Sequence, residues 1–224
     1  MIDLQNISQG GGSIVELVSR LRDIEKHNDR EMFRQTMRRV GLLVANELSK
    51  TFTYQAVPIT TPLAQTTGHQ LSAPPVVATI LRAGLPLYEG VLDVFTGADS
   101  AFVAAYRKHD ADGSFKIAVN YCTCPDLSGR SLILADPMIA TGSSLIDGLE
   151  VLFEQGGQPD EVHIIAAIGA EPGVHMVQTK LERYGLKRAS IWCAAIDPEL
   201  DENKYIVPGL GDAGDLAFGP KKQA

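Results

Sequence analysis

The chain has 224 residues, a hydrophobic fraction of 45% and a formal net charge of −7. These values are typical of a globular protein and exclude intrinsic disorder as its main state. The acidic excess disfavours a basic, groove-coating nucleic-acid binder, and at first sight it also disfavours a strongly anionic ligand.

Neither a membrane span nor a secretory signal is expected. No run approaches the roughly 18 consecutive apolar residues of a membrane-spanning helix, and the polar start, Met1 to Gly12, lacks the blocks of a secretory signal. The cysteines Cys122, Cys124 and Cys193 have neither the number nor the spacing of a disulfide framework or a zinc site. We therefore expect a cytoplasmic protein with reduced thiols and no membrane partner.

The N-terminal third is predicted to hold two helices and a strand. Residues 13–16 fit a capping box, in which Ser13 would cap a helix and Glu16 would reach back to it. Apolar residues recur at every third or fourth position from near Asp29 to Ser49, which indicates a second helix. Its arginines are expected on a solvated or subunit-contacting face; they are Arg34, Arg38 and Arg39. A strand at 54–60 and a polar loop to Pro75 follow.

From Pro75 onward, short apolar runs alternate with helix-length segments. Strands are predicted at 76–81, 101–106, 115–121, 131–135, 162–168 and 189–196, and helices at 85–95, 142–155 and 174–184. The turn residues Asp110 to Gly113 indicate a hairpin between the second and third of these strands. Continuous apolar strands predict an α/β fold with a parallel sheet covered on both faces, whose ligand binds at the carboxyl ends of the strands.

The loop after the fourth of these strands has the residues of a phosphate site. The strand ends in Asp136, which is placed to accept hydrogen bonds from sugar hydroxyls. A helix N-terminus with the hydroxyls of Thr141, Ser143 and Ser144 suits a phosphate monoester, and Gly142 allows close approach of the backbone. Taken alone, these residues fit a second interpretation about equally well, namely an ordinary N-cap at Thr141 or Ser143 and an Asx turn at Asp136.

The run LILADPMIATGSSL, residues 132–145, resembles the phosphoribosyl-diphosphate motif of the type I phosphoribosyltransferases. Its Asp-Pro-Met variant is similar to that of the uracil phosphoribosyltransferases. Residues 80–85 match the family's diphosphate loop, and residues 205–215, with Phe218-Gly219, match its uracil-binding segment, which is the most discriminating of the three. The resemblance covers nearly the whole chain. It implies the type I fold, a parallel sheet with helices on both faces, an N-terminal helical arm and a small β-hairpin or hood.

We expect one domain over residues 1–224, with the helical arm and hood at 1–74, the α/β core at 75–196, and the uracil-binding loop and tail at 197–224. Arg82 ends a strand before Ala-Gly, where a guanidinium can close on a diphosphate, although a lone surface arginine is the default interpretation of such a residue. Arg107 stands where the family has an arginine that contacts the phosphoribosyl donor, and its neighbours Lys108 and His109 are interpreted as solvated hairpin residues.

The stretch Gly209 to Gly214 matches a dinucleotide fingerprint by its letters only. That fingerprint needs a following helix and a second strand, and only ten residues follow Gly214. We expect instead an ordered loop without a helix, and not a flexible C-terminal loop. Its backbone N–H and C=O groups are expected to pair with the edge of uracil.

The resemblance implies transfer of the phosphoribosyl group of 5-phospho-α-D-ribose 1-diphosphate (PRPP) to N1 of uracil, which forms UMP and diphosphate. It implies catalytic roles for Asp136, Asp212 and Arg107, with Asp212 the best candidate for a general base. Mg²⁺ is the expected cofactor, carried mainly by the diphosphate and not by a protein metal site. The implied PRPP-binding residues are Arg82, Ala83, Gly84, Arg107, Asp136, Pro137, Met138, Ile139, Ala140, Thr141, Gly142, Ser143, Ser144 and Asp212. The implied uracil-binding residues are Tyr205, Ile206, Gly211, Asp212 and Ala213.

The chain departs from the family pattern at three positions. Ser143 stands where a second glycine is usual and would be strained if that position required a positive φ. Leu216 replaces a usual basic residue, and Pro220 a usual threonine. The resemblance also implies a homodimer or higher homo-oligomer and makes GTP a candidate effector.

Two other functions compete with this one. An RNA-binding pyrimidine regulator of the same fold is disfavoured by the acidic balance and the aromatic content of 6%. A phosphoribosyltransferase for another base is disfavoured by the segment at 205–215.

The acidic excess is concentrated in one segment, because six acidic residues and one basic residue lie between Asp197 and Asp215. The charge therefore opposes binding of nucleic acid but not of one small phosphorylated substrate.

Overall fold

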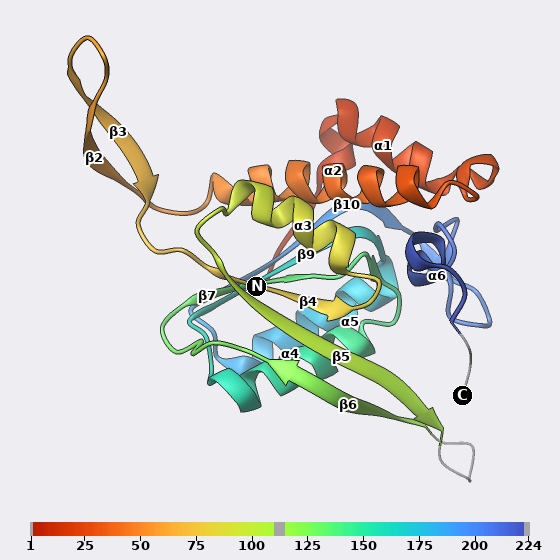
Figure 1. Cartoon of the computed structure of the whole chain (residues 1–224). Helices are drawn as coiled ribbons and strands as arrows, with labels where there is room; N and C mark the ends of the chain where they lie inside the picture. The colour runs from red at the N-terminus through yellow and green to blue at the C-terminus, as the bar shows by residue number, and fades with distance from the viewer. Residues whose placement is uncertain (1, 110–114, 222–224) are drawn as a thin grey trace.

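The computed structural model describes residues 2–109 and 115–221, without the side chains of 105–120 (Figure 1). Its main sheet consists of β1 (Asp3–Asn6), β4 (Val76–Leu81), β5 (Asp99–His109), β6 (Phe115–Thr123), β7 (Ser131–Ala135), β8 (Met138–Ile139), β9 (Glu161–Ala170) and β10 (Arg188–Asp197). The strand order is β1-β10-β9-β7-β4-β5-β6, with β8 paired to β9. All pairings are parallel except that of β5 with β6, which confirms the predicted hairpin. Its predicted turn lies outside the described residues.

Helices cover both faces of this sheet (Figure 1). One face carries α1 (Ser13–Arg22), α2 (Arg30–Ser49) and α3 (Leu85–Val94), and the other carries α4 (Ser143–Gly156) and α5 (Glu171–Leu181). Short 3₁₀ helices lie at Ile7–Gly10, Ile24–Lys26 and Glu182–Tyr184. Successive residues of β4 pack into the two separate cores, Val77 with the first face and Ala78 with the second. Burial on both faces explains the continuous apolar strands, and the predicted fold class is confirmed.

The central strands β4 and β7 are neighbours in the sheet, and the chain continues from them to opposite sides of it. From β4 it passes through α3 to β5 on one side, whereas from β7 it passes through α4 to β9 on the other. The loops after β4 and β7 therefore open at a topological switch point. Doubly wound proteins bind their ligands at this place, because diverging connections leave a crevice beyond the strand ends.

Several predicted boundaries are confirmed closely. The strands β4 and β7 begin and end at the predicted residues. Asp29 is the N-cap of α2, and its Oδ1 accepts the Met32 N–H at 2.8 Å. Two arginines of α2 contact other segments of the same chain. Arg38 pairs with Asp93 of α3 at 2.7 Å, and Arg34 donates to the Ala217 carbonyl at 2.8 Å.

Other local predictions are wrong. The capping box does not form, because Gly12 occupies the N-cap of α1 and Glu16 pairs with Arg20 at 2.9 Å instead. The polar loop before Pro75 contains the strand β3 (Gln65–Leu71), which pairs antiparallel with β2 (Tyr54–Thr60). The C-terminal loop is not helix-free, since it leads into α6 (Ala213–Phe218). The short strands β1, β11 (Glu199–Leu200) and β12 (Ile206–Val207) were not predicted.

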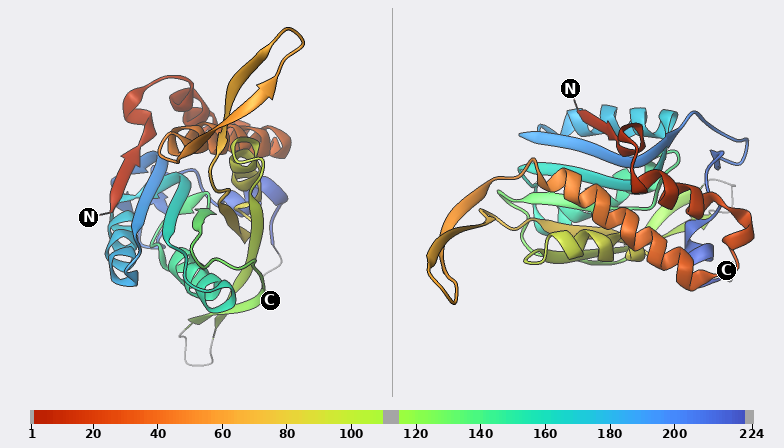
Figure 2. Two further views of the ribbon diagram at one scale, coloured as in Figure 1. Left: turned by 90° about the vertical axis from the view of Figure 1, so that its left-hand side faces the viewer. Right: turned by 90° about the horizontal axis from the view of Figure 1, so that it is seen from above.

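The hairpin of β2 and β3 projects from the body of the molecule (Figure 2). Its side chains are exposed or half-buried throughout, which is why its polar sequence shows no alternation toward a core. Three of its apolar side chains are open to solvent: Leu63 near the tip is 97% exposed, Tyr54 47% and Ile59 44%. Within the described residues, no helix combines the length and the apolar character needed to cross a bilayer.

Candidate active site

The loop after β4 packs directly on the end of β7. The Thr79 hydroxyl donates a buried hydrogen bond to the Ala135 carbonyl oxygen at 2.8 Å. A Cβ at Gly84 would lie 2.0 Å from Thr79 Oγ1 and 2.9 Å from the Ala135 oxygen, so the loop can approach this closely only with glycine. This packing places the loops that carry Arg82 and Asp136 beside one another at the carboxyl edge of the sheet.

The loop after β7 turns into α4 through Gly142, which has a φ of 80°. A Cβ at Gly142 would lie 2.6 Å from Val177 Cγ2, so both the conformation and the space demand glycine. Ser143 is the first helical residue, and the positive φ falls on its neighbour. The serine that replaces the family's glycine is therefore unstrained.

The first turn of α4 has the properties of an anion site. The N–H groups of the first turn of a helix lack intrahelical acceptors and lie at the positive end of the helix dipole. Thr141 Oγ1 donates to Ser143 Oγ at 3.2 Å, and it accepts the Ser143 N–H at 3.4 Å. Thr141, Ser143 and Ser144 all keep solvent exposure, so their hydroxyls are accessible to a ligand.

Some predicted PRPP-binding residues hold the loop and do not line it with their side chains. The Pro137 carbonyl accepts the N–H groups of Ala167 and Ile168, both at 3.1 Å. The Ile139 side chain is fully buried in the core, and its backbone pairs with Gly169 of β9. These two positions can contribute to ligand binding only through the backbone, whereas Met138 and Ala140 remain partly exposed.

Asp136 follows the last residue of β7, and its N–H donates to the Ile165 carbonyl at 3.1 Å. Burial raises the pKa of the Asp136 carboxyl to about 7, although a hydrogen bond from the Met138 N–H acts against the shift. The residue keeps a partly exposed face at the mouth of the loop. A carboxyl group with this pKa can accept a proton near neutral pH.

A largely buried ion pair anchors the segment that carries the predicted uracil-binding residues. The Asp197 carboxylate, at the end of β10, accepts two hydrogen bonds from the Arg22 guanidinium at 2.7 and 2.8 Å. It also accepts the Gly209 N–H at 2.9 Å, and Arg22 donates to the Gly209 carbonyl at 3.1 Å. The Asp197 side chain is 6% exposed. One ion pair thus holds both backbone groups of Gly209.

The sequence interpretation missed this anchor. The sequence gives no predicted role to Arg22, and Asp197 is counted there only as one acidic residue among several. The position of Asp197 could have indicated its role, because Asp197 ends a buried parallel strand just as Asp136 follows one.

The predicted uracil-binding residues lie in different environments. Tyr205 is exposed, and its N–H donates to Asp201 Oδ1 at 2.7 Å. Ile206 is buried in β12, which pairs with β11. Gly211 is exposed with a φ of 89°, and Ala213 is fully buried at the start of α6. The exposed backbone of this segment is therefore centred on Gly211 and Asp212.

Asp212 is the N-cap of α6. Its Oδ1 accepts the Asp215 N–H at 3.0 Å, and its Oδ2 accepts a hydrogen bond from Lys221 Nζ at 2.8 Å. Partial burial raises the pKa of Asp212, but the bonds from Lys221 and from the Asp215 N–H outweigh it, and the net pKa is lowered. The Asp212 carboxylate is therefore ionised at neutral pH and poorly suited to accept a proton.

The C-terminal segment also meets the Arg82 loop (Figure 1). Arg82 Nη2 donates to the Gly219 carbonyl at 3.3 Å and lies 3.7 Å from Asp215 Oδ1. The Ala83 methyl group is 3.6 Å from the position that a Cβ at Gly214 would take. The structure thus brings the loops of Arg82, Asp136 and Asp212 to one edge. Arg107 lies on β5 and its side chain is outside the described residues, as are those of Lys108 and His109, so their roles stay predictions.

Three of the six acidic residues at 197–215 pair with cations from other segments. Asp197 pairs with Arg22, Asp212 with Lys221, and Asp215 contacts Arg82 at 3.7 Å and Lys221 at 3.6 Å. The local charge counted along the sequence is therefore much reduced in space.

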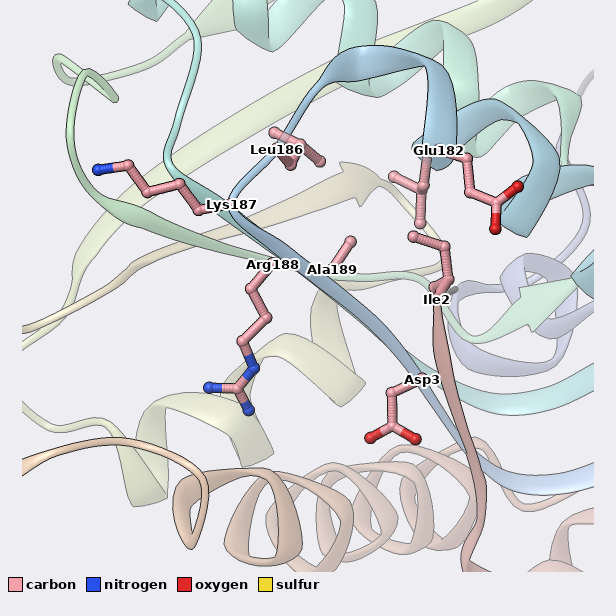
Figure 3. A pocket seen from close by; sticks show the side chains of 8 residues that line it. Ile2, Asp3, Glu182, Leu186, Lys187, Arg188 and Ala189 are labelled. Atoms are coloured by element: carbon pink, nitrogen blue, oxygen red, sulfur yellow. The ribbon is translucent and has the colours of Figure 1, made fainter.

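A hollow of about 510 Å³ lies at the opposite edge of the sheet, around the amino ends of β1 and β10 (Figure 3). Its charged lining has both signs, with Asp3 and Glu182 against Lys187 and Arg188. Lys187 Nζ is already bound to Asp160 at 2.7 Å. Because this hollow is remote from the carboxyl ends of the strands, we do not assign it to the active site.

A doubly wound α/β sheet, with a helix N-terminus suited to an anion and a glycine-centred loop beside its switch point, is typical of phosphoribosyltransferase-like proteins. The family profile described as uracil phosphoribosyltransferase matches residues 11–220. The chain belongs to this family.

Named relatives agree with this assignment. A uracil phosphoribosyltransferase from Porphyromonas gingivalis is 43% identical over 204 residues, which cover 91% of this chain and 92% of the relative. One from Methanococcus maripaludis is 39% identical over 210 residues, which cover 92% and 86%. The solved structure of the AQ2163 protein from Aquifex aeolicus aligns with a TM-score of 0.82 at 27% identity, covering 96% of this chain and 98% of that one.

The ion pair of Arg22 and Asp197 generates a prediction. We expect Arg22→Met to lower the free energy of unfolding by about 3 kcal/mol, because it leaves a buried carboxylate without its partner. The KM for uracil should also rise, since the Gly209 carbonyl loses its hydrogen bond from Arg22 and the Asp197 carboxylate that holds the Gly209 N–H loses its partner. Arg20→Met is the matched control on the same helix, because Arg20 forms only an exposed pair with Glu16, and it should cost less than about 1 kcal/mol. Urea unfolding and steady-state kinetics measure both; equal effects of the two variants would contradict the anchoring role.

Proposed function

We propose that this chain transfers the 5-phosphoribosyl group of PRPP to N1 of uracil, forming UMP and diphosphate. The observation that carries the proposal is the convergence of the phosphate-binding turn, the Arg82 loop and the glycine-centred segment at one edge of the sheet. Relatives that align with about nine-tenths of the chain carry the name of this activity. The comparisons give no support to an RNA-binding regulator.

On the PRPP side, each loop has a part suited to its chemistry. The first turn of α4 and the hydroxyls around Ser143 bind the 5′-phosphate, and the Asp136 carboxylate accepts hydrogen bonds from ribose hydroxyls. Arg82 and Arg107 stabilise the diphosphate as its negative charge develops. Binding the phosphate far from C1 holds that carbon in place for reaction, so the chain needs no covalent nucleophile.

On the base side, the exposed backbone around Gly211 and Asp212 pairs with the edge of uracil. Glycine-rich backbone exposes N–H and C=O groups at fixed positions, and these match the alternating acceptors and donors of uracil. Because the Arg22–Asp197 pair holds Gly209, this edge is rigid before uracil arrives. Cytosine presents an amino group where uracil presents a carbonyl, so the same backbone should reject it.

The general base is Asp136 in preference to Asp212. A base must be partly unprotonated at neutral pH yet basic enough to take a proton. The pKa of about 7 at Asp136 meets this requirement, whereas the pKa of Asp212 is lowered. Asp212 instead serves as an ionised carboxylate that orients the base loop and tolerates positive charge at C1.

Mg²⁺ is the proposed cofactor, held mainly by the diphosphate. Asp212, through water, offers the oxygen donors that this ion prefers. When bound, it would offset the charge of the leaving diphosphate. The described residues contain no cluster of three or more metal-ligating side chains, so the chain's own contribution would be these few oxygen contacts.

The activity is tested by diphosphate release from PRPP with a panel of bases, with and without Mg²⁺. We expect release with uracil and with 5-substituted uracils, loss of turnover in the presence of a chelator, and little release with cytosine, hypoxanthine or adenine. Equal use of cytosine would contradict a uracil edge that is read by the backbone. Release with a purine alone would contradict the proposed substrate.

A second prediction concerns Asp136. We expect Asp136→Asn to lower turnover at least about 100-fold, as loss of a general base does. In the wild type, the pKa of about 7 is raised above the ordinary value, so the stability contributed by the protonated carboxyl is lost as the pH rises through about 7. The variant should therefore be more stable than the wild type at pH 8, by up to about 4 kcal/mol.

Kinetics and thermal unfolding at pH 5 and pH 8 check both halves of this expectation. Asp126→Asn is the control, because Asp126 is a solvent-exposed carboxylate bound to the Ser128 N–H at 2.9 Å and lies in the loop before β7, at the edge opposite the candidate site. Full activity in Asp136→Asn would remove Asp136 from the mechanism.

The chain is proposed to form a homodimer or a higher homo-oligomer through the β2–β3 hairpin. An isolated two-stranded hairpin is marginally stable in water, and this one exposes Tyr54, Ile59 and Leu63. A second copy related by two-fold symmetry would cover them with the same surface.

We further propose a cytoplasmic location, supported by free thiols at Cys122, Cys124 and Cys193. A GTP effector remains an expectation from the resemblance.

The oligomer is tested by sedimentation. We expect the wild type to sediment as a dimer or larger, and Ile59→Lys combined with Leu63→Lys to weaken association at least about tenfold, or about 1.4 kcal/mol. Leu42→Lys serves as the control, because Leu42 is also a partly exposed apolar residue, at 37%, but lies on the helix α2. A wild type that is monomeric at micromolar concentration would contradict the proposal.

A further inference from the structure

The segment Gly219–Lys221 crosses the edge of the candidate site and contacts both neighbouring loops. Arg82 Nη2 donates to the Gly219 carbonyl at 3.3 Å. Lys221 Nζ donates to Asp212 Oδ2 at 2.8 Å and lies 3.6 Å from Asp215 Oδ1. The Lys221 N–H also donates to Asp215 Oδ1, at 3.4 Å. One lysine therefore bridges the two carboxylates that flank the start of α6.

The two oxygens of Asp212 have different partners, and together these fix the carboxylate. Oδ1 caps α6 through the Asp215 N–H, and Oδ2 accepts the hydrogen bond from Lys221. A helix cap alone leaves Oδ2 free to exchange partners with water. With Lys221 bound, rotation of the carboxylate would break a charge-assisted hydrogen bond.

The charges at this edge are balanced in pairs. Asp212 and Asp215 face Arg82 and Lys221, and the distances of 2.8, 3.6 and 3.7 Å link the four groups into one network. If Lys221 lost its charge, Asp212 and Asp215 would share the single remaining cation. The exposed backbone beside Asp212, at Gly211, would then lose the restraint that sets its direction.

We propose that Lys221 is a positioning residue for uracil, which holds the Asp212 carboxylate and the adjoining backbone in the orientation that receives the base. The inference rests on the proposed function, because that function places uracil at this loop. Lys221 acts through Asp212 and does not contact the reacting atoms. Its loss should therefore weaken uracil binding more than PRPP binding.

The test compares three variants in steady-state kinetics. Lys221→Met should raise the KM for uracil about tenfold, the effect of losing one charge-assisted hydrogen bond, and should leave the KM for PRPP within about twofold. Lys221→Arg should restore most of the uracil affinity, because it keeps the positive charge and the donor. Lys187→Met is the matched control, since Lys187 forms an exposed pair with Asp160 at 2.7 Å at the opposite edge.

A double-mutant cycle separates positioning from a general structural effect. We expect Lys221→Met to weaken UMP binding, measured by calorimetry, in the wild-type background but not in Asp212→Asn, where the carboxylate is already absent. Calorimetry serves even if a variant has no turnover. Unchanged uracil KM in Lys221→Met, equal rises for both substrates, or an equal loss of UMP affinity in both backgrounds would each overturn the inference. Wild-type protein that makes no UMP from uracil would overturn the proposed function itself, which is a distinguishable result.

Discussion

The close contact between β4 and β7 at the switch point is the constraint on which the site depends. Only glycine at position 84 lets the first loop rest on the Thr79 hydroxyl and the Ala135 carbonyl. That contact sets the separation between the loop that begins at Arg82 and the loop that begins at Asp136. Because the two following helices lie on opposite faces, the loops diverge above the contact and leave the edge open to a ligand.

The second half of the site is assembled from segments that are remote in sequence. Arg22 from the end of α1 meets Asp197 from the end of β10, and together they hold Gly209. Three of the six acidic residues of this region pair with cations from three other places in the chain. The net charge of −7 therefore says little about small ligands, because opposite charges at contact distance screen one another wherever the fold brings them together.

The predictable parts of the fold are those with strong local signals. The strands β4 and β7 were predicted to the residue because they are continuous apolar runs buried on both faces, and α2 because its periodicity is long and Asp29 caps it. The strand β3 was missed because its Thr- and Gln-rich sequence packs on no core. The helix α6 was missed because six residues with a glycine show no period; it depends on the Asp212 cap and on burial of Ala213 and Ala217.

The sequence by itself determined the fold class and the family, because these are written in continuous apolar strands and short contiguous motifs. Only the tertiary structure decided how two similar aspartates differ. Burial raises the pKa of Asp136 to about 7, whereas Lys221 and backbone N–H groups lower that of Asp212. Desolvation and the distance to a charge depend on which remote residues surround a carboxyl group, and neither quantity can be derived from its neighbours along the chain.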